Sequence, residues 1–271
     1  MALGGNPVFN SKNYREQTRA AGPAGAAPTA YAQQNMSPQA LQDLYSQPSA
    51  SGMQMGRLTY TEVINKTALC LGLVVIGAAI GWQLPVLMLV GALVGLVLGL
   101  VNSFKREPSP ILILLYAGFE GLFLGGISSF FEAQYPGIAV QAVLATFSVF
   151  AVTLVLYRSG KYRATPKMTK MFMIALIGYG LFSLLNFVLM LTGAVGGEFG
   201  MRSGGLGLAI GAFAVLLATY ALVMDFTSVS EGVRQGAPAK MAWTAAFGLT
   251  VTLIWLYVEI LRILAILRGN D

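Results

Sequence analysis

The sequence predicts an all-α integral membrane protein with seven transmembrane helices. The chain has 271 residues, of which 56% are hydrophobic and only 10% are charged, whereas soluble chains carry about 25% charged residues. Apolar runs of about 20 residues recur along the chain, and this is the length that a helix needs to cross the hydrocarbon core. Because these runs are continuous rather than alternating, they favour helices.

The predicted membrane domain covers residues 57–268. Residues 1–56 are rich in Ala, Gly, Pro, Ser and Gln, which is typical of a disordered tail. Residues 55–66 have helical spacing of apolar side chains and are expected to lie at the membrane interface before the first span. Prolines and charged loops separate the apolar runs. The predicted spans cover about residues 67–84, 86–104, 111–131, 138–157, 168–192, 205–229 and 242–267.

The distribution of basic residues predicts the orientation of the chain. Of 17 Lys and Arg residues, 14 fall before the first span or in the loops after the second, fourth and sixth spans. Arg202 and Arg268 lie on the opposite side, and Arg262 lies within the seventh span. The positive-inside rule therefore predicts a cytoplasmic amino terminus and a carboxy terminus outside. The same basic loops are expected to attract anionic lipids of the bilayer rather than nucleic acid.

Glycines at regular spacing predict close contacts between the helices. The second span carries Gly91, Gly95 and Gly99, which lie on one face of a helix. Similar sets occur in the third and sixth spans, at Gly118, Gly121 and Gly125 and at Gly204, Gly207 and Gly211.

Acidic residues within the apolar runs are the candidate functional residues. Asp225 lies toward the end of the sixth span, Glu259 within the seventh and Glu120 near the middle of the third. Ionisable groups at such depth often mark an ion pathway, a proton relay or a structural pair. Arg262 is three residues after Glu259 and shares its helix face, so it is expected to pair with Glu259 or with Glu120.

Two alternatives are open for Asp225. It either approaches Glu259, so that the two carboxyl groups share a proton and sense pH, or it is solvated or paired with a loop cation such as Arg106, Lys105 or Arg234. The first arrangement requires residues 240–248 to lie along the inner interface, because Glu259 otherwise lies about 28 Å along the seventh helix from Lys240. Two carboxylates also suit calcium, although two ligands alone form a weak site.

Composition argues against an enzyme and against cofactor binding. The chain has no histidine and a single cysteine, Cys70. It therefore lacks the usual bases and ligands of serine, zinc and haem sites. Asp225 is the only aspartate within the predicted spans, whereas an aspartyl protease needs two. We expect no catalytic residues and no cofactor other than a calcium ion.

The segments Ala221–Phe226 and Leu256–Leu261, the seven-span plan and the opening Asn6–Asn10 resemble the Bax inhibitor-1 family, particularly its bacterial members. The resemblance implies a six-helix bundle around a central seventh helix. It also implies a pH-sensitive calcium leak gated by a carboxylate pair on the sixth and seventh spans, matched here by Asp225 and Glu259. An arginine after the second span that latches the closed state is matched by Arg106 or Lys105.

Two classes of function are therefore expected. The first is a pH-sensitive calcium leak channel of the bacterial inner membrane, with calcium and protons as its ligands. The alternative is a regulator of membrane stress or proteostasis that does not transport and that binds a membrane protease or stress protein. A secondary transporter is less favoured, because no inverted repeat with broken helices is apparent.

Overall fold

The computed structural model describes residues 56–105, 107–160 and 163–269. Within this part of the chain lie seven helices that are long and apolar enough to cross a membrane, which confirms the predicted fold class. The chain is therefore a multi-pass membrane protein. The helices are α4 (Tyr60–Gln83), α5 (Leu87–Phe104), α6 (Pro110–Gln134), α7 (Ile138–Arg158), α8 (Pro166–Leu191), α9 (Gly204–Arg234) and α10 (Met241–Gly269), with a short 3-10 turn, η1 (Gly200–Arg202), before α9.

Helix starts coincide with capping residues in the sequence. The hydroxyl of Thr59 accepts a hydrogen bond from the backbone N–H of Glu62 at 3.2 Å, which satisfies one of the free donors of the first turn. Consequently α4 begins at Tyr60 rather than near residue 67. Residues 60–66, for which helical spacing was predicted, form the first turns of this helix, and their place at the membrane interface stays a prediction. Pro110 and Pro166 are the first residues of α6 and α8. A backbone N–H at this position would have no acceptor within the helix, so proline, which lacks this N–H, is well tolerated there.

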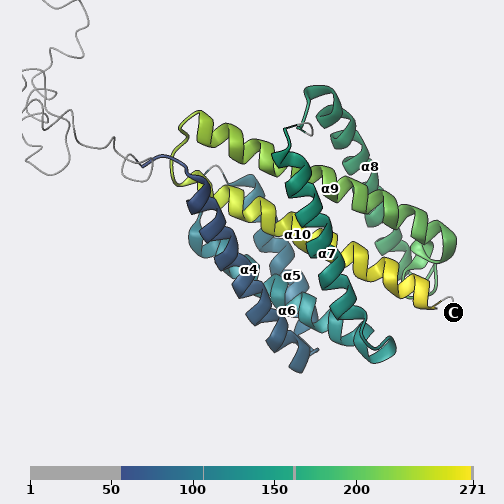
Figure 1. Cartoon of the computed structure of the whole chain (residues 1–271). Coiled ribbons are helices and arrows are strands. Elements are labelled where there is room, and N and C mark those ends of the chain that lie inside the picture. Colours follow the sequence, from purple (N-terminus) through teal and green to yellow (C-terminus); the bar gives the residue numbers. More distant parts are fainter. Residues whose placement is uncertain (1–55, 106, 161–162, 270–271) are drawn as a thin grey trace, which may run out of the picture. The chain divides into compact units, whose positions relative to one another are not determined.

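Helix α10 is the central helix of the described bundle. In its most apolar stretch 72% of the residues are buried by protein, against 6% in α8. Figure 1 shows α10, in yellow, running through the bundle, and α4, α6, α7 and α9 all contact it. This burial supports the arrangement that the resemblance implied, a bundle around a central seventh helix.

Glycines allow the backbones of α4 and α6 to touch. A Cβ atom on Gly121 would lie 2.9 Å from the Cα of Gly77, and one on Gly125 would lie 2.7 Å from the backbone carbonyl carbon of Ala78. Real Cβ atoms do not approach so closely, so only glycine fits at these positions. By contrast, Gly118 has open space around it. The predicted role of the glycine sets in helix packing therefore holds for Gly121 and Gly125 but not for Gly118.

Helices α9 and α10 form an antiparallel hairpin with a short turn over residues 235–240. A Cβ atom on Gly211 of α9 would lie 2.6 Å from the Ile263 side chain of α10. Nearer the turn, Asp225 of α9 lies beside Gly248 and Thr252 of α10. The two helices therefore run side by side over several turns, and this register decides which side chains meet.

The segment before α4 is hydrogen-bonded to the α9–α10 turn. The backbone N–H of Leu58 donates to the carbonyl of Ala237 at 2.7 Å, and the N–H of Ala239 donates to the carbonyl of Gly56 at 2.8 Å. We call residues 56–58 the strap. It ties the start of the described chain to the end of the bundle at which α9 turns into α10.

Candidate ion pathway and charged cluster along α10

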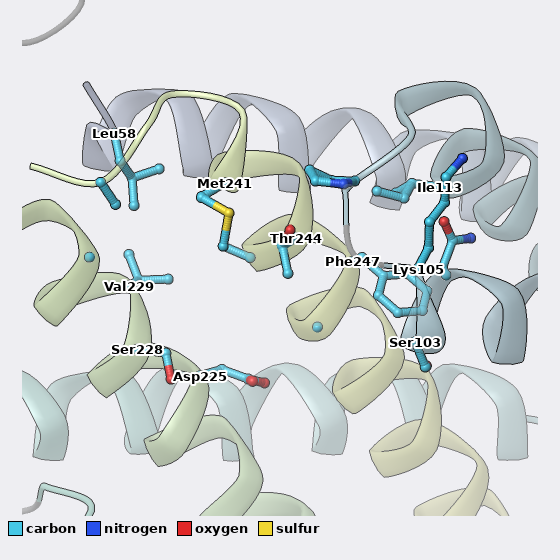
Figure 2. A pocket seen from close by; sticks show the side chains of 16 residues that line it. Leu58, Ser103, Lys105, Ile113, Asp225, Ser228, Val229, Met241, Thr244 and Phe247 are labelled. Atoms are coloured by element: carbon cyan, nitrogen blue, oxygen red, sulfur yellow. The ribbon is translucent and has the colours of Figure 1, made fainter. Parts of the chain in front are cut away.

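Asp225 lies at a cavity between the α9–α10 hairpin, Leu58 of the strap and the ends of α5 and α6. Its carboxylate accepts a hydrogen bond of 2.8 Å from the hydroxyl of Thr252. The cavity has a volume of about 520 Å³. Figure 2 shows Asp225 at one edge of the cavity and Lys105 at another. One acidic and one basic residue therefore line a common space that is large enough for several water molecules.

Ten of the 16 residues that line this cavity are apolar or glycine, and six have polar side chains. They come from α5, the loop after it, α9 and α10, so four separate parts of the chain contribute. Hydroxyl, amide and carboxylate oxygens of this kind can solvate a hydrated cation. The polar lining residues are Asn102, Ser103, Lys105, Asp225, Ser228 and Thr244.

The predicted loop cations occupy different positions. Lys105 lines the cavity, but within the described residues no ion pair joins it to Asp225. Arg234 pairs instead with Glu231, at 3.3 Å on the surface of α9. Arg106 lies outside the described residues. Of the predicted candidates, Lys105 is thus the cation that the structure brings to the same cavity as Asp225.

A surface ion pair joins the α5–α6 loop to the α9–α10 turn on the same side of the bundle. The ammonium of Lys240 donates to the Glu107 carboxylate at 2.8 Å. This hydrogen bond, together with the positive charge of Lys240, lowers the pKa of the exposed Glu107 carboxyl below its ordinary value. The pair therefore links two loops in a way that acid would weaken.

Glu259 lies in a cluster of charged and aromatic groups. Arg202 of η1 donates to both of its carboxylate oxygens, at 3.0 and 3.3 Å, and Arg262 forms a second ion pair with it. The Tyr179 hydroxyl from α8 and the Trp255 indole, the latter at 3.3 Å, also donate to this carboxylate. Glu259 is only 3% exposed. The pairing of Glu259 with Arg262, one of the predicted alternatives, is thus present, and Arg202 joins it.

This cluster opens on a second cavity of about 440 Å³. Its walls come from α5, α6, the segment before η1, and α10, and they are mainly apolar and aromatic. Arg202, Glu259 and Arg262 form its charged part, with the exposed Glu198 also lining it. Each of the two predicted carboxylates therefore lies at a cavity of its own.

The two carboxylates lie beside different turns of α10. Thr252, the partner of Asp225, is seven residues before Glu259, which corresponds to about 10 Å along the helix. Residues 241–269 form one continuous helix, so residues 240–248 do not lie apart from the span as contact between Asp225 and Glu259 would require. In this conformation the two groups are two separate sites along one helix.

Glu120 lies at the contact between α6 and α5. A Cβ atom on Gly95 would come within 2.8 Å of its carboxylate oxygen, so the glycine makes room for the acid. Arg262, predicted to pair with Glu259 or with Glu120, binds Glu259. In the part of the chain that the structure describes, no ion pair or hydrogen bond involves the Glu120 side chain.

Four partners of the acidic residues were not predicted: Thr252, Tyr179, Trp255 and Arg202. The hairpin contained a signal for Thr252, because residues at similar distances from the turn of an antiparallel hairpin lie side by side. Asp225 lies nine residues before the end of α9, and Thr252 lies 11 residues after the start of α10. No local pattern connects Tyr179 or Arg202 with Glu259. Their meeting depends on how α8 and η1 pack against α10.

The described residues contain no group of three or more His, Cys, Asp or Glu side chains that could hold a metal ion. Any calcium at Asp225 or Glu259 would have a single carboxylate at each site, with hydroxyl, carbonyl or water oxygens as its remaining ligands. A single carboxylate makes a weak calcium site.

One known protein family matches almost the whole chain. A family profile described as Bax inhibitor 1 like matches residues 6–269, a stretch that includes all seven membrane helices. Comparison with curated proteins finds no match. Together with the seven helices and the buried α10, the profile assigns the chain: it belongs to the Bax inhibitor 1 like family.

Proposed function

We propose that the chain is a pH-sensitive calcium leak channel of the bacterial inner membrane, with its amino terminus in the cytoplasm. The observation that carries the proposal is the cavity of about 520 Å³ with Asp225 and five other polar residues in its lining. A carboxylate at the edge of a cavity that is large enough for several water molecules attracts cations and gives them a first oxygen ligand.

In this proposal the two carboxylates have different roles. Asp225 accepts one hydrogen bond from a neutral hydroxyl and faces the cavity, so it acts as the proton-sensitive ion site. Glu259 is held by two arginines and anchors α8 and η1 to α10 further along the pathway. The residues between Thr252 and Glu259 include the fully buried Leu256, which acts as part of the closed barrier.

Lys105 is the proposed counter-charge of Asp225. Opposite charges facing one cavity attract each other, and the attraction is stronger where the surroundings are less polar than water. Protonation of Asp225 removes the negative charge of its carboxylate and therefore this attraction. We therefore expect the closed form to weaken, and calcium flux to rise, as pH falls.

Calcium entry into proteoliposomes that enclose a calcium indicator tests the proposal. Wild-type flux should rise on acidification, whereas Asp225→Asn should give a flux that no longer depends on pH. Glu231→Gln is the matched control, because Glu231 lies on the same helix but is exposed and pairs with Arg234. It should behave like the wild type.

Flux equal to that of empty liposomes, or a pH response that Asp225→Asn leaves intact, would overturn the proposal. Folded protein without flux would favour the other function considered, a regulator that acts through protein partners.

A further inference from the structure

The charge of the Glu259 cluster is unbalanced. Arg202 and Arg262 both bind the one carboxylate of Glu259. These three groups, of which Glu259 and Arg262 are buried and Arg202 is partly buried, together carry one positive charge. Glu198 also lines the cavity, but it is exposed to solvent, where screening weakens its effect on the buried groups. A buried excess of positive charge is unfavourable unless an anion offsets it.

Both arginines have buried donor groups that no described residue accepts. The Nε–H of Arg202 and the Nε–H of Arg262 are buried and lack a hydrogen-bond partner among the described residues. Arg262 is only 7% exposed, and both side chains line the cavity of about 440 Å³. A guanidinium presents donors in a planar fork that matches the oxygens of a carboxylate or a phosphate.

The rest of the cavity is suited to hydrocarbon. Its other walls are formed almost entirely by apolar and aromatic side chains, and its volume falls within the range usual for ligand sites. Phe130, which is half exposed, lies at its edge, so the cavity reaches the outer surface of the bundle. The apolar lining residues include Met88, Phe123, Ile127, Phe130, Phe131 and Phe199.

We propose that this cavity binds an oxoanion attached to a hydrocarbon chain, with the anionic group held by Arg202 and Arg262 and the chain lying along the α5 and α6 walls. An anionic phospholipid has this chemistry. Free phosphate would present the same kind of oxygen atoms to the two arginines, but without a hydrocarbon chain. The site is separate from the Asp225 cavity, and its existence does not depend on ion conduction.

Lipid retention measures this binding directly. Protein is reconstituted into phosphatidylcholine nanodiscs that contain a minor fraction of phosphatidylglycerol, and native mass spectrometry counts the phosphatidylglycerol molecules kept after gentle release. Wild type should keep this lipid. Arg202→Gln and Arg262→Gln should each weaken its retention about tenfold, the effect of one lost hydrogen bond to a charged group.

Two further variants make the test specific. Arg268→Gln is the matched control, because Arg268 is on α10 but is exposed and bonds to Pro136 and Gln141; it should retain lipid like the wild type. Glu259→Gln removes the competing carboxylate and frees both guanidinium groups, so it should retain more lipid. Glu259→Gln is itself expected to be destabilised, but loss of folding lowers lipid retention, so an increase in retention cannot result from it.

Inorganic phosphate distinguishes the two sources of the anion. If the protein in phosphatidylcholine alone is stabilised against heat by phosphate, and the stabilisation requires Arg202 and Arg262, a free oxoanion is the ligand. If phosphatidylglycerol is retained and phosphate does not displace it, the ligand is lipid. The proposal would be overturned if the wild type neither retained phosphatidylglycerol nor was stabilised by phosphate. It would also be overturned if both effects were the same in wild type, Arg202→Gln, Arg262→Gln and Glu259→Gln.

Discussion

The variant Glu259→Gln tests whether the Glu259 carboxylate acts as part of a structural ion cluster or as a gate. The substitution keeps the size of the side chain but leaves Arg202 and Arg262 without a counter-ion in a buried site. Removing one partner of a buried ion pair costs about 3–5 kcal/mol of stability. For comparison, Asp225→Asn should cost only about 1 kcal/mol, because the amide oxygen can still accept the hydrogen bond from Thr252.

The free energy of unfolding of each variant can be measured by denaturant titration in mild detergent, followed by circular dichroism. The double variant Glu259→Gln/Arg262→Gln should be less destabilised than the sum of its two single variants, because each single variant leaves a charge that the double variant no longer contains. The reasoning is refuted if Glu259→Gln is within about 1 kcal/mol of wild type, or if the two losses simply add.

Three further predictions concern packing, pH and capping. Gly125→Ala should destabilise the bundle by about 1–3 kcal/mol, since its Cβ would meet backbone; Gly118→Ala, in open space on the same helix, should be neutral or stabilising. Because Lys240 lowers the pKa of Glu107 below its ordinary value of 4.5, their pair should add stability above that value and lose it as pH falls through the lowered pKa. The melting temperature of Glu107→Gln should therefore be lower than that of wild type at neutral pH, and the difference should vanish in acid. Thr59→Ala should cost about 1 kcal/mol in the same unfolding assay, and no change would show that its hydroxyl does not stabilise α4.

Much of the fold could be predicted from the sequence because a bilayer imposes strong local rules. Continuous apolar runs must be helices of a certain length, and prolines and charges mark where they end. The start of α4 was harder to predict, because Thr59 caps a polar first turn that hydropathy alone does not assign to the span. Close packing at Gly121 and open space at Gly118 also could not be distinguished, since both belong to the same spacing.

The candidate sites were predictable only where their residues are close in sequence. The Glu259–Arg262 pair follows from a spacing of three residues on one helix. Arg202 could be assigned only to a loop on one side of the membrane, and its contact with Glu259 depends on the fold of the segment after α8. Asp225 and Glu259 are each matched by the family resemblance, but the register of the α9–α10 hairpin decides which groups they meet.

The strap connects the amino-terminal segment to the cavity at Asp225. Residues 56–58 are hydrogen-bonded to the turn that joins α9 and α10, and Leu58 also lines the cavity at Asp225. Residues 1–55 continue covalently from this strap. The strap thus joins those residues both to α4, along the backbone, and to the α9–α10 turn, through its two backbone hydrogen bonds.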